Sequence, residues 1–540
     1  MRRLCRGLLF AAPLLLALFV LAPEGEARPG GGQSYSGSSS SRGSSSSSSS
    51  RGSSSSSSRS YSSSGSSSSS GGSSSGSGSP LCMMMMVVVF IVVMTASKKN
   101  PQQKGGWSTT HTPGEPRRSR GVDSVRLPPR SQPSSPAGES PREVLARLRT
   151  VGPPGPDGRP VPFDPDFSVV LFEDFLYALY AKAHEARGGG QLHTLSAYLS
   201  EEARQSLRAL GQPDEVKAVV VGAMRYMLVS PLTARSEQVL MRVRFESNYT
   251  EVSGLGQAQS WYVMEEWTLH RGTKVKSRPP SQARIFKCPS CGAPLDAVRG
   301  STCSYCQKTV DTGEFDWVVQ GVRVLQREPR GPQLTGTTEE QGTDLPTVKQ
   351  PGVEQRMQQL LKEDTQLSWD SLSHRIGLIF HELQAAWSSR KWERARPYVS
   401  DNLFQMQLYW MEAYRKQGLR NVTENARLTC VELVRVTSDV HFHAVTVRLH
   451  ATSQDYTLRE SDGEVVGGSR TDDRSYTEYW TLIRGTGAKG RPSTDKRCPS
   501  CGAALALNMA GQCTHCSAKV TSGEFDWVLS RIEQDESYQG

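Results

Sequence analysis

Helical and strand-like hydrophobic patterns alternate after residue 163, and the same order occurs twice. Apolar residues three and four positions apart predict an amphipathic helix over 172–183 and another over 376–387. A further helix is expected from an N-cap at Ser400 to a stop at Gly418. The residues expected to face the core are Phe172, Phe175, Leu176, Leu179 and Ala183 in the first helix, Ile376, Ile379, Phe380, Leu383 and Trp387 in the second, and Leu403, Met406, Trp410, Met411 and Tyr414 in the third.

Strand patterns follow these helices. Apolar and polar residues alternate over 241–246 and again over 445–450, which predicts antiparallel strands buried on one face only. Helices followed by a run of strands indicate an α+β fold, with a curved sheet wrapped around the first helices.

Short sequence matches support a tandem duplication. Tyr-Leu-Ser at 198–200 matches Tyr-Val-Ser at 398–400, and Trp-Thr-Leu occurs at 267–269 and 480–482. Gly-Glu-Phe-Asp-Trp-Val stands at 313–318 and again at 523–528. Two long copies are too few for a solenoid, so we expect two domains. They cover residues 164–326 and 367–534, and 327–366 is expected to be a linker.

Each copy contains two Cys-x-x-Cys pairs near its end, a spacing that is typical of zinc ribbons. Four thiolates suit the tetrahedral coordination of Zn²⁺, and a full thiolate set leaves no open position for a catalytic water. The alternative is a set of disulfides in a secreted domain. We predict two structural zinc ions, bound within 288–306 and 498–516. The ligands are Cys288, Cys291, Cys303 and Cys306 in the first site, and Cys498, Cys501, Cys513 and Cys516 in the second.

The ribbons lie between strand patterns, so each is expected at the tip of a final hairpin. Of the 11 cysteines in the chain, Cys5 and Cys82 lie at or in apolar segments outside the ribbons. Cys430, within a strand-like run, is expected to be a small buried apolar residue.

The N-terminal third has a membrane-protein pattern. Residues 1–27 combine arginines, an apolar run and small residues, as in a signal peptide or an uncleaved first span. Residues 28–80 are almost wholly Ser and Gly, and such a segment is predicted to be disordered. The apolar stretch 81–96 is the predicted transmembrane helix, although it is slightly short for one. Residues 97–163 form a Pro/Arg-rich linker, either a plain spacer or a contact with anionic headgroups.

The charges that flank the predicted span indicate its orientation. Lys98 and Lys99 follow the span directly, and positive flanks stay in the cytoplasm. We therefore expect a single-pass membrane protein with cytoplasmic globular domains, at a bacterial inner membrane. A reducing cytoplasm would keep the thiols free for zinc.

The formal net charge of +10 does not by itself indicate a nucleic-acid partner. Eight thiolates with two Zn²⁺ would add about −4, so the folded part is less basic than the composition suggests.

Several motifs together resemble the Tim44-like domain family. These are Asp-Pro-Asp-Phe-Ser at 164–168, the helix–helix–Tyr-Leu-Ser pattern, Glu-Tyr-Trp-Thr-Leu-Ile-Arg-Gly at 478–485 and the ending Phe-Asp-Trp-Val-Leu-Ser-Arg-Ile at 525–532. The resemblance covers the second copy well and the first more loosely. It implies a cone-shaped α+β fold similar to nuclear transport factor 2, a concave pocket, membrane-proximal binding and no catalytic residues. The two copies and their ribbons depart from the family pattern.

Catalytic motifs are scarce in this sequence. It contains no P-loop, no Gly-x-Ser-x-Gly and no His-Glu-x-x-His. The carboxylates just after the ribbons are expected to be solvated or to bind ribbon backbone; they are Glu314, Asp316, Glu524 and Asp526. His441 and His443 are expected on an exposed sheet surface, and His515 is expected to be exposed.

We therefore expect a membrane-anchored, non-catalytic scaffold. Its anchor contacts lipid, and its cone pockets hold a protein, peptide or lipid partner; a role in protein translocation or membrane-protein assembly fits the family resemblance. One alternative is a nucleic-acid- or ribosome-associated protein, which would need a basic face with exposed aromatics. The apolar loop of the second ribbon argues against it. The other is an enzyme using the cone pocket, which would need a buried carboxylate or histidine with a shifted pKa.

Overall fold

The computed structural model describes residues 140–331, 343–493, 496–535 and 537–540. The predicted signal peptide (1–27), Ser/Gly segment (28–80), transmembrane helix (81–96) and most of the 97–163 linker lie outside these residues. Within the described ranges, no helix is both long enough and apolar enough to cross a bilayer.

The first half is a four-stranded antiparallel sheet with helices on one face. Its strand order is β1-β2-β3-β6, so β3 and β6 are neighbours although the first ribbon separates them in sequence. The elements are α2 (Pro141–Ala146), η1 (Arg147–Arg149), α3 (Val169–Arg187), η2 (Gly188–Leu195), α4 (Glu201–Arg208), β1 (Glu215–Val229), β2 (Gln238–Val252), β3 (Ala258–Gly272), η3 (Pro280–Gln282), η4 (Leu295–Ala297), β4 (Val298–Arg299), β5 (Thr302–Cys303) and β6 (Val318–Glu328).

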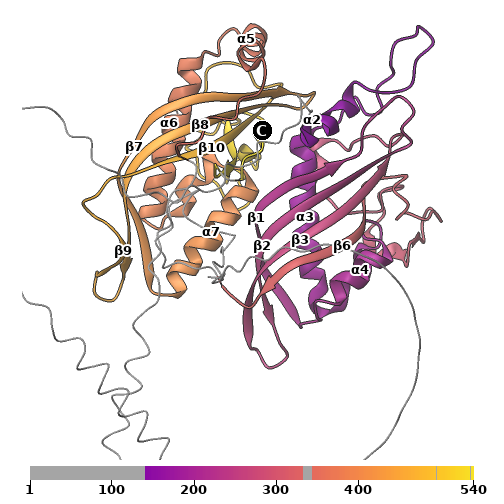
Figure 1. The fold of residues 1–540 in the computed structure, drawn as a ribbon, viewed down its shortest axis with the longest axis horizontal. Helices are drawn as coiled ribbons and strands as arrows, with labels where there is room; N and C mark the ends of the chain where they lie inside the picture. The colour runs from indigo at the N-terminus through magenta and orange to yellow at the C-terminus, as the bar shows by residue number, and fades with distance from the viewer. Residues whose placement is uncertain (1–139, 332–342, 494–495, 536) are drawn as a thin grey trace, which may run out of the picture. The chain divides into compact units, whose positions relative to one another are not determined.

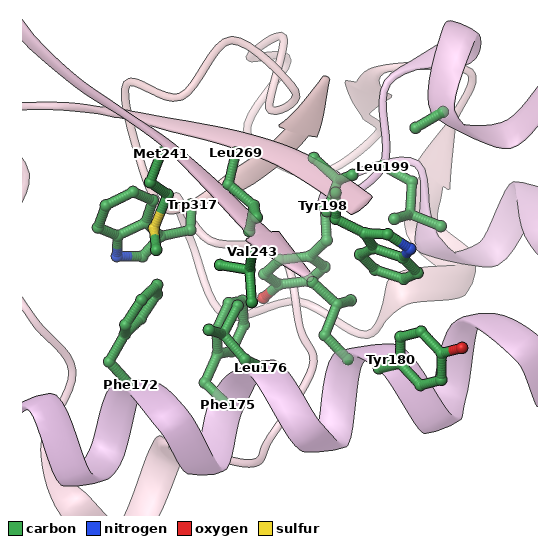
Figure 2. Packing of buried hydrophobic residues seen from close by; sticks show 14 of the residues in the cluster. Phe172, Phe175, Leu176, Tyr180, Tyr198, Leu199, Met241, Val243, Leu269 and Trp317 are labelled. Atoms are coloured by element: carbon green, nitrogen blue, oxygen red, sulfur yellow. The ribbon is translucent and has the colours of Figure 1, made fainter. Parts of the chain in front are cut away.

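Helix α3 lies across the sheet and fills the space beneath it with aromatic rings. Its Ser168 N-cap accepts a hydrogen bond from the Leu171 N–H (3.4 Å). Figure 2 shows the side chains of Phe172 and Phe175 pointing from the helix toward sheet residues such as Val243. The predicted core face of this helix is confirmed, because all five of its residues are buried.

The second half has the same arrangement of helices on an antiparallel sheet, but its sheet has five strands (Figure 1). The strand order is β11-β10-β8-β7, with β9 paired to β8, and the second ribbon separates β10 from β11 in sequence. The elements are α5 (Val353–Glu363), α6 (Trp369–Ser388), η5 (Trp392–Tyr398), α7 (Asp401–Lys416), β7 (Leu419–Ser438), β8 (Phe442–Arg459), β9 (Val465–Gly468), β10 (Arg474–Gly485), η6 (Val520–Ser522) and β11 (Val528–Glu533).

The limits predicted for the third helix agree with the structure, whereas α6 begins seven residues before the predicted 376. Ser400 caps α7 by accepting from the Leu403 N–H, and the helix ends at Lys416, two residues before Gly418 at φ +66°. The five predicted core residues of α6 are buried. Helix α5 lies inside the stretch expected to be a linker, and its Val353, Met357 and Leu360 belong to the core of this half.

Two smaller predictions were wrong. Cys430 is exposed, because β7 shifts register between Leu428 and Cys430, and such a bulge breaks the alternation of faces. His443 is 7% exposed rather than on an open surface, and its Nδ1 shares a 2.8 Å hydrogen bond with the Ser438 hydroxyl. Burial, reinforced by the nearby Arg484, lowers the pKa of His443.

The prediction that β8 is buried on one face only was also wrong. Thr446 and Arg448, on the face expected to be polar and open, are 4% and 2% exposed. Residues 343–349 and Asp535 cover Arg448 on this face, and the Thr446 hydroxyl is paired with that of Thr481.

Candidate metal centres

The eight predicted cysteines gather into two four-thiol clusters. In each cluster the Sγ atoms all lie within 4.8 Å of one another. The distance is 3.9 Å between Cys288 and Cys306, and 3.8 Å between Cys498 and Cys516. These separations are far longer than the ~2.05 Å bond of a disulfide and suit four ligands around one ion. The clusters can therefore each hold a metal ion, as the spacing predicted.

Four tight turns of one kind present these thiols. In the first turn the Gly292 N–H donates to the Cys288 carbonyl, and the Cys288 N–H donates to the Ala293 carbonyl (2.8 and 2.7 Å). Gly292 has φ +76°, which a side chain would disfavour. The other turns repeat this pattern from Cys303, Cys498 and Cys513.

Backbone N–H groups around the clusters favour the thiolate. The Lys308 N–H lowers the pKa of Cys306 to about 7, and the Ala518 N–H does the same for Cys516. Thiolates, not thiols, bind metal, so these donors prepare the last cysteine of each cluster for a soft divalent cation such as Zn²⁺.

Each ribbon is attached to its own half at two points. The stem strands pair directly, β3 with β6 and β10 with β11. A second contact ties each ribbon to the segment just before α4 in the first half and just before α7 in the second. In the first half the Tyr198 hydroxyl donates to the Lys287 carbonyl (2.6 Å), and in the second Arg396 Nε donates to the Met509 carbonyl (3.1 Å). The ribbons are thus fixed extensions of the last hairpin.

The two ribbons differ in how deeply they join the core. Cys288, Cys303, Val298 and Val310 belong to the main hydrophobic cluster of the first half. The buried thiols of the second ribbon form a small separate cluster with Val520. Metal in the first ribbon should therefore contribute more to the stability of its half.

The carboxylates after the ribbons divide into two kinds. Glu314 and Glu524 are exposed, as expected. Asp316 and Asp526 instead accept from the following Trp N–H, at 2.8 and 2.7 Å. Burial raises the pKa of Asp316, although Arg278 lies 2.5 Å away. These aspartates shape the ribbon stem. His515 is exposed, as predicted.

The sequence patterns did not reveal a buried ion pair that is present in both halves. Arg271 reaches Asp164 at 2.9 Å, and Arg484 reaches Asp364 at 2.6 Å, with all four side chains at most 5% exposed. The sequence does mark both partners of this pair. Trp-Thr-Leu-x-Arg-Gly occurs in both copies, and each copy has an Asp four residues before its helix N-cap. The pairs join the start of the first helix to the strand that enters the ribbon.

A second missed group lies inside the first half, between α3 and the sheet. Glu265 and His184 are fully buried, 3.2 Å apart, and the Trp267 indole donates to the same carboxylate at 2.8 Å. Burial opposes ionisation of Glu265, but the His184 imidazole and the indole N–H outweigh it, so its pKa is lowered. Aromatic side chains surround the pair, with Tyr249 stacked on His184. The arrangement locks the helix to the sheet.

Comparison with known families supports the resemblance found from the motifs. Residues 353–493 match the model of the Tim44-like domain. The match spans α5 to β10 and ends just before the second ribbon, which lies outside the matched region. A search among curated proteins finds no match for this chain.

Proposed function

We propose, from the Tim44-like domain at residues 353–493, that this chain is a non-catalytic binding scaffold that takes part in protein translocation or membrane-protein assembly. In this proposal the two halves are tandem Tim44-like units, each similar to the cone of nuclear transport factor 2. The segment 81–96 anchors them at the cytoplasmic face of a bacterial inner membrane.

One observation carries the scaffold role: several buried ionisable groups in each half make structural contacts. The Asp–Arg pair of each half, the Glu265–His184 pair of the first half, and the Arg278–Asp316 and Arg375–Asp526 pairs each join two separate segments of the fold. Thiolate-only metal clusters likewise suit structural zinc, since no ligand position is left for water.

Photo-crosslinking in the native membrane tests the proposal. A crosslinking amino acid placed at exposed positions of the full-length chain, such as Leu255 or Val440, should capture membrane-embedded translocation components or polypeptides in transit. The same chains kept in the dark are the control and should give no adducts. Crosslinks confined to ribosomal proteins or RNA would instead favour the nucleic-acid alternative.

A further inference from the structure

The outer face of the first sheet has a charged row across all four strands, with arginines on β1, β2 and β6 and a glutamate on β3. Directly paired positions place Arg225 opposite Arg244, Arg244 opposite Glu266 and Glu266 opposite Arg323. Arg225 and Arg244 are like charges directly opposite one another, an arrangement that by itself disfavours strand pairing. Arg242 joins the row from the next outward position of β2.

Two nearly buried glutamates hold these arginines in place. Glu266 lies 2.8 Å from Arg323, 3.2 Å from Arg242 and 3.3 Å from Arg244. Glu246 lies 2.7 Å from Arg225. The arginine side chains nevertheless remain accessible, from 24% exposed for Arg225 to 65% for Arg323. Four arginines over two glutamates leave the row with a net charge of +2.

The second half shows what a covered version of this row looks like. Tyr479, one residue before Trp480, stands at the position of Glu266. Its neighbours across the sheet are Arg448 and Glu533, and Glu432 lies opposite Arg448. Residues 343–349 lie over them: Arg448 donates to the Leu345 carbonyl (2.8 Å), and the Val348 N–H donates to the Tyr479 hydroxyl (3.1 Å). Arg448 also pairs with Asp535 at 2.7 Å and is 2% exposed, whereas its counterpart Arg244 is 28% exposed.

The covering segment is matched in charge to the row beneath it. Lys349 lies 3.6 Å from Glu432, and the Thr347 hydroxyl donates to the same carboxylate at 3.1 Å. The first row reverses this balance, with Arg225 in the place of Glu432 and Arg323 in the place of Glu533. A segment that covered it would need carboxylates where 343–349 has Lys349.

We propose that the arginine row of the first half is a docking surface for an acidic polypeptide segment of a partner protein. Guanidinium forks fixed by Glu246 and Glu266 match carboxylates in two-point geometry. A nucleic acid would be expected to use exposed aromatic rings, but Tyr262 on this face is 1% exposed. The precedent of residues 343–349 favours a polypeptide over a bilayer. This docking surface lies on the outer face of the sheet and requires neither the membrane anchor nor the cone pockets of the proposed function.

Binding of an acidic peptide to the full-length chain in nonionic detergent tests this. The probe is a fluorescent ten-residue peptide of alternating Glu and Thr, whose carboxylates share one face when it is extended. At about 50 mM salt we expect binding that Arg242→Glu with Arg323→Glu weakens roughly tenfold, because two contacts become repulsions. Arg323→Gln alone, the mildest change, should weaken it about twofold.

The matched control changes the net charge equally at another surface. Arg415→Glu with Arg427→Glu alters two arginines of the second half that are 64% and 58% exposed. Peptide affinity that is kept in this control and lost in the row variant supports the proposal. Equal loss in both, no binding by the unaltered chain, or tighter binding of phosphatidylserine vesicles or poly(U) through the same arginines would overturn it.

Discussion

The Asp364 carboxylate receives donors from two separate parts of the second half. Arg484 Nη2 lies 2.6 Å from Oδ2, and the Gly490 N–H donates to the same oxygen at 2.9 Å. The Arg484 guanidinium also lies 4.8 Å from the ring centre of Trp527, on the other side of the ribbon stem. One buried pair thus joins the start of α6 to both ends of the ribbon insertion.

We expect Arg484→Met to lower the free energy of unfolding by about 3 kcal/mol, because it leaves the Asp364 carboxylate buried without its charged partner. Urea unfolding followed by tryptophan fluorescence measures the loss, and Trp527 should report it directly. Arg415→Met, which removes an exposed i,i+3 pair, should change stability little. Equal losses in the two variants would contradict a structural role for the buried pair.

The same pair predicts how stability depends on pH. Burial alone would raise the pKa of Asp364, but the Gly490 N–H and Arg484 outweigh it, so the folded pKa is lowered. A group with a lowered folded pKa stabilises the fold above its unfolded pKa, and this contribution is lost as the pH falls through the folded value. Asp364→Asn should therefore flatten the pH dependence of the melting temperature below about pH 4. An unchanged acid profile in this variant would show that the carboxylate contributes nothing.

Features set by local sequence were predicted well. The apolar stripes of α3 and α6, the Ser400 cap and the four-cysteine clusters each depend on residues a few positions apart, or on fixed turn geometry. The burial of Arg448 on the outer face of β8 could not be read locally, because it depends on residues 343–349, about 100 positions earlier, and on Asp535. Cys430 was misplaced by a bulge, which adds one residue to a strand without any mark in the apolar pattern.

Removing the charge of Glu265 should destabilise the first half. We expect Glu265→Gln to cost about 2 kcal/mol, since the buried His184 loses its ionised partner. His184→Gln installs the residue that the second half has at the matching helix position, Gln384. The double variant should lose less than the sum of the two single losses, by about 1 kcal/mol in a double-mutant cycle of urea unfolding. Strict additivity would mean that the two groups do not interact.

Measurements of metal content and melting temperature should distinguish the roles of the two ribbons. The full-length chain is expected to contain two zinc ions by elemental analysis, and Cys288→Ser or Cys498→Ser should each remove one. Because the first cluster is part of the main core of its half, Cys288→Ser should lower the melting temperature more than Cys498→Ser, whose cluster is separate. The second variant should mainly loosen the hairpin that ends at Trp527.

Cys430→Ser is the matched control for these substitutions, because this cysteine is exposed and outside both clusters. It should keep both zinc ions and the melting temperature of the unaltered chain. A chain without bound metal would refute the ribbon assignment. Equal destabilisation by Cys288→Ser and Cys498→Ser would be compatible with two metal sites but would refute the proposed difference in how the ribbons join the core. Since binding and local folding are coupled in such sites, zinc added back after chelation should restore the melting temperature of the unaltered chain but not that of Cys288→Ser.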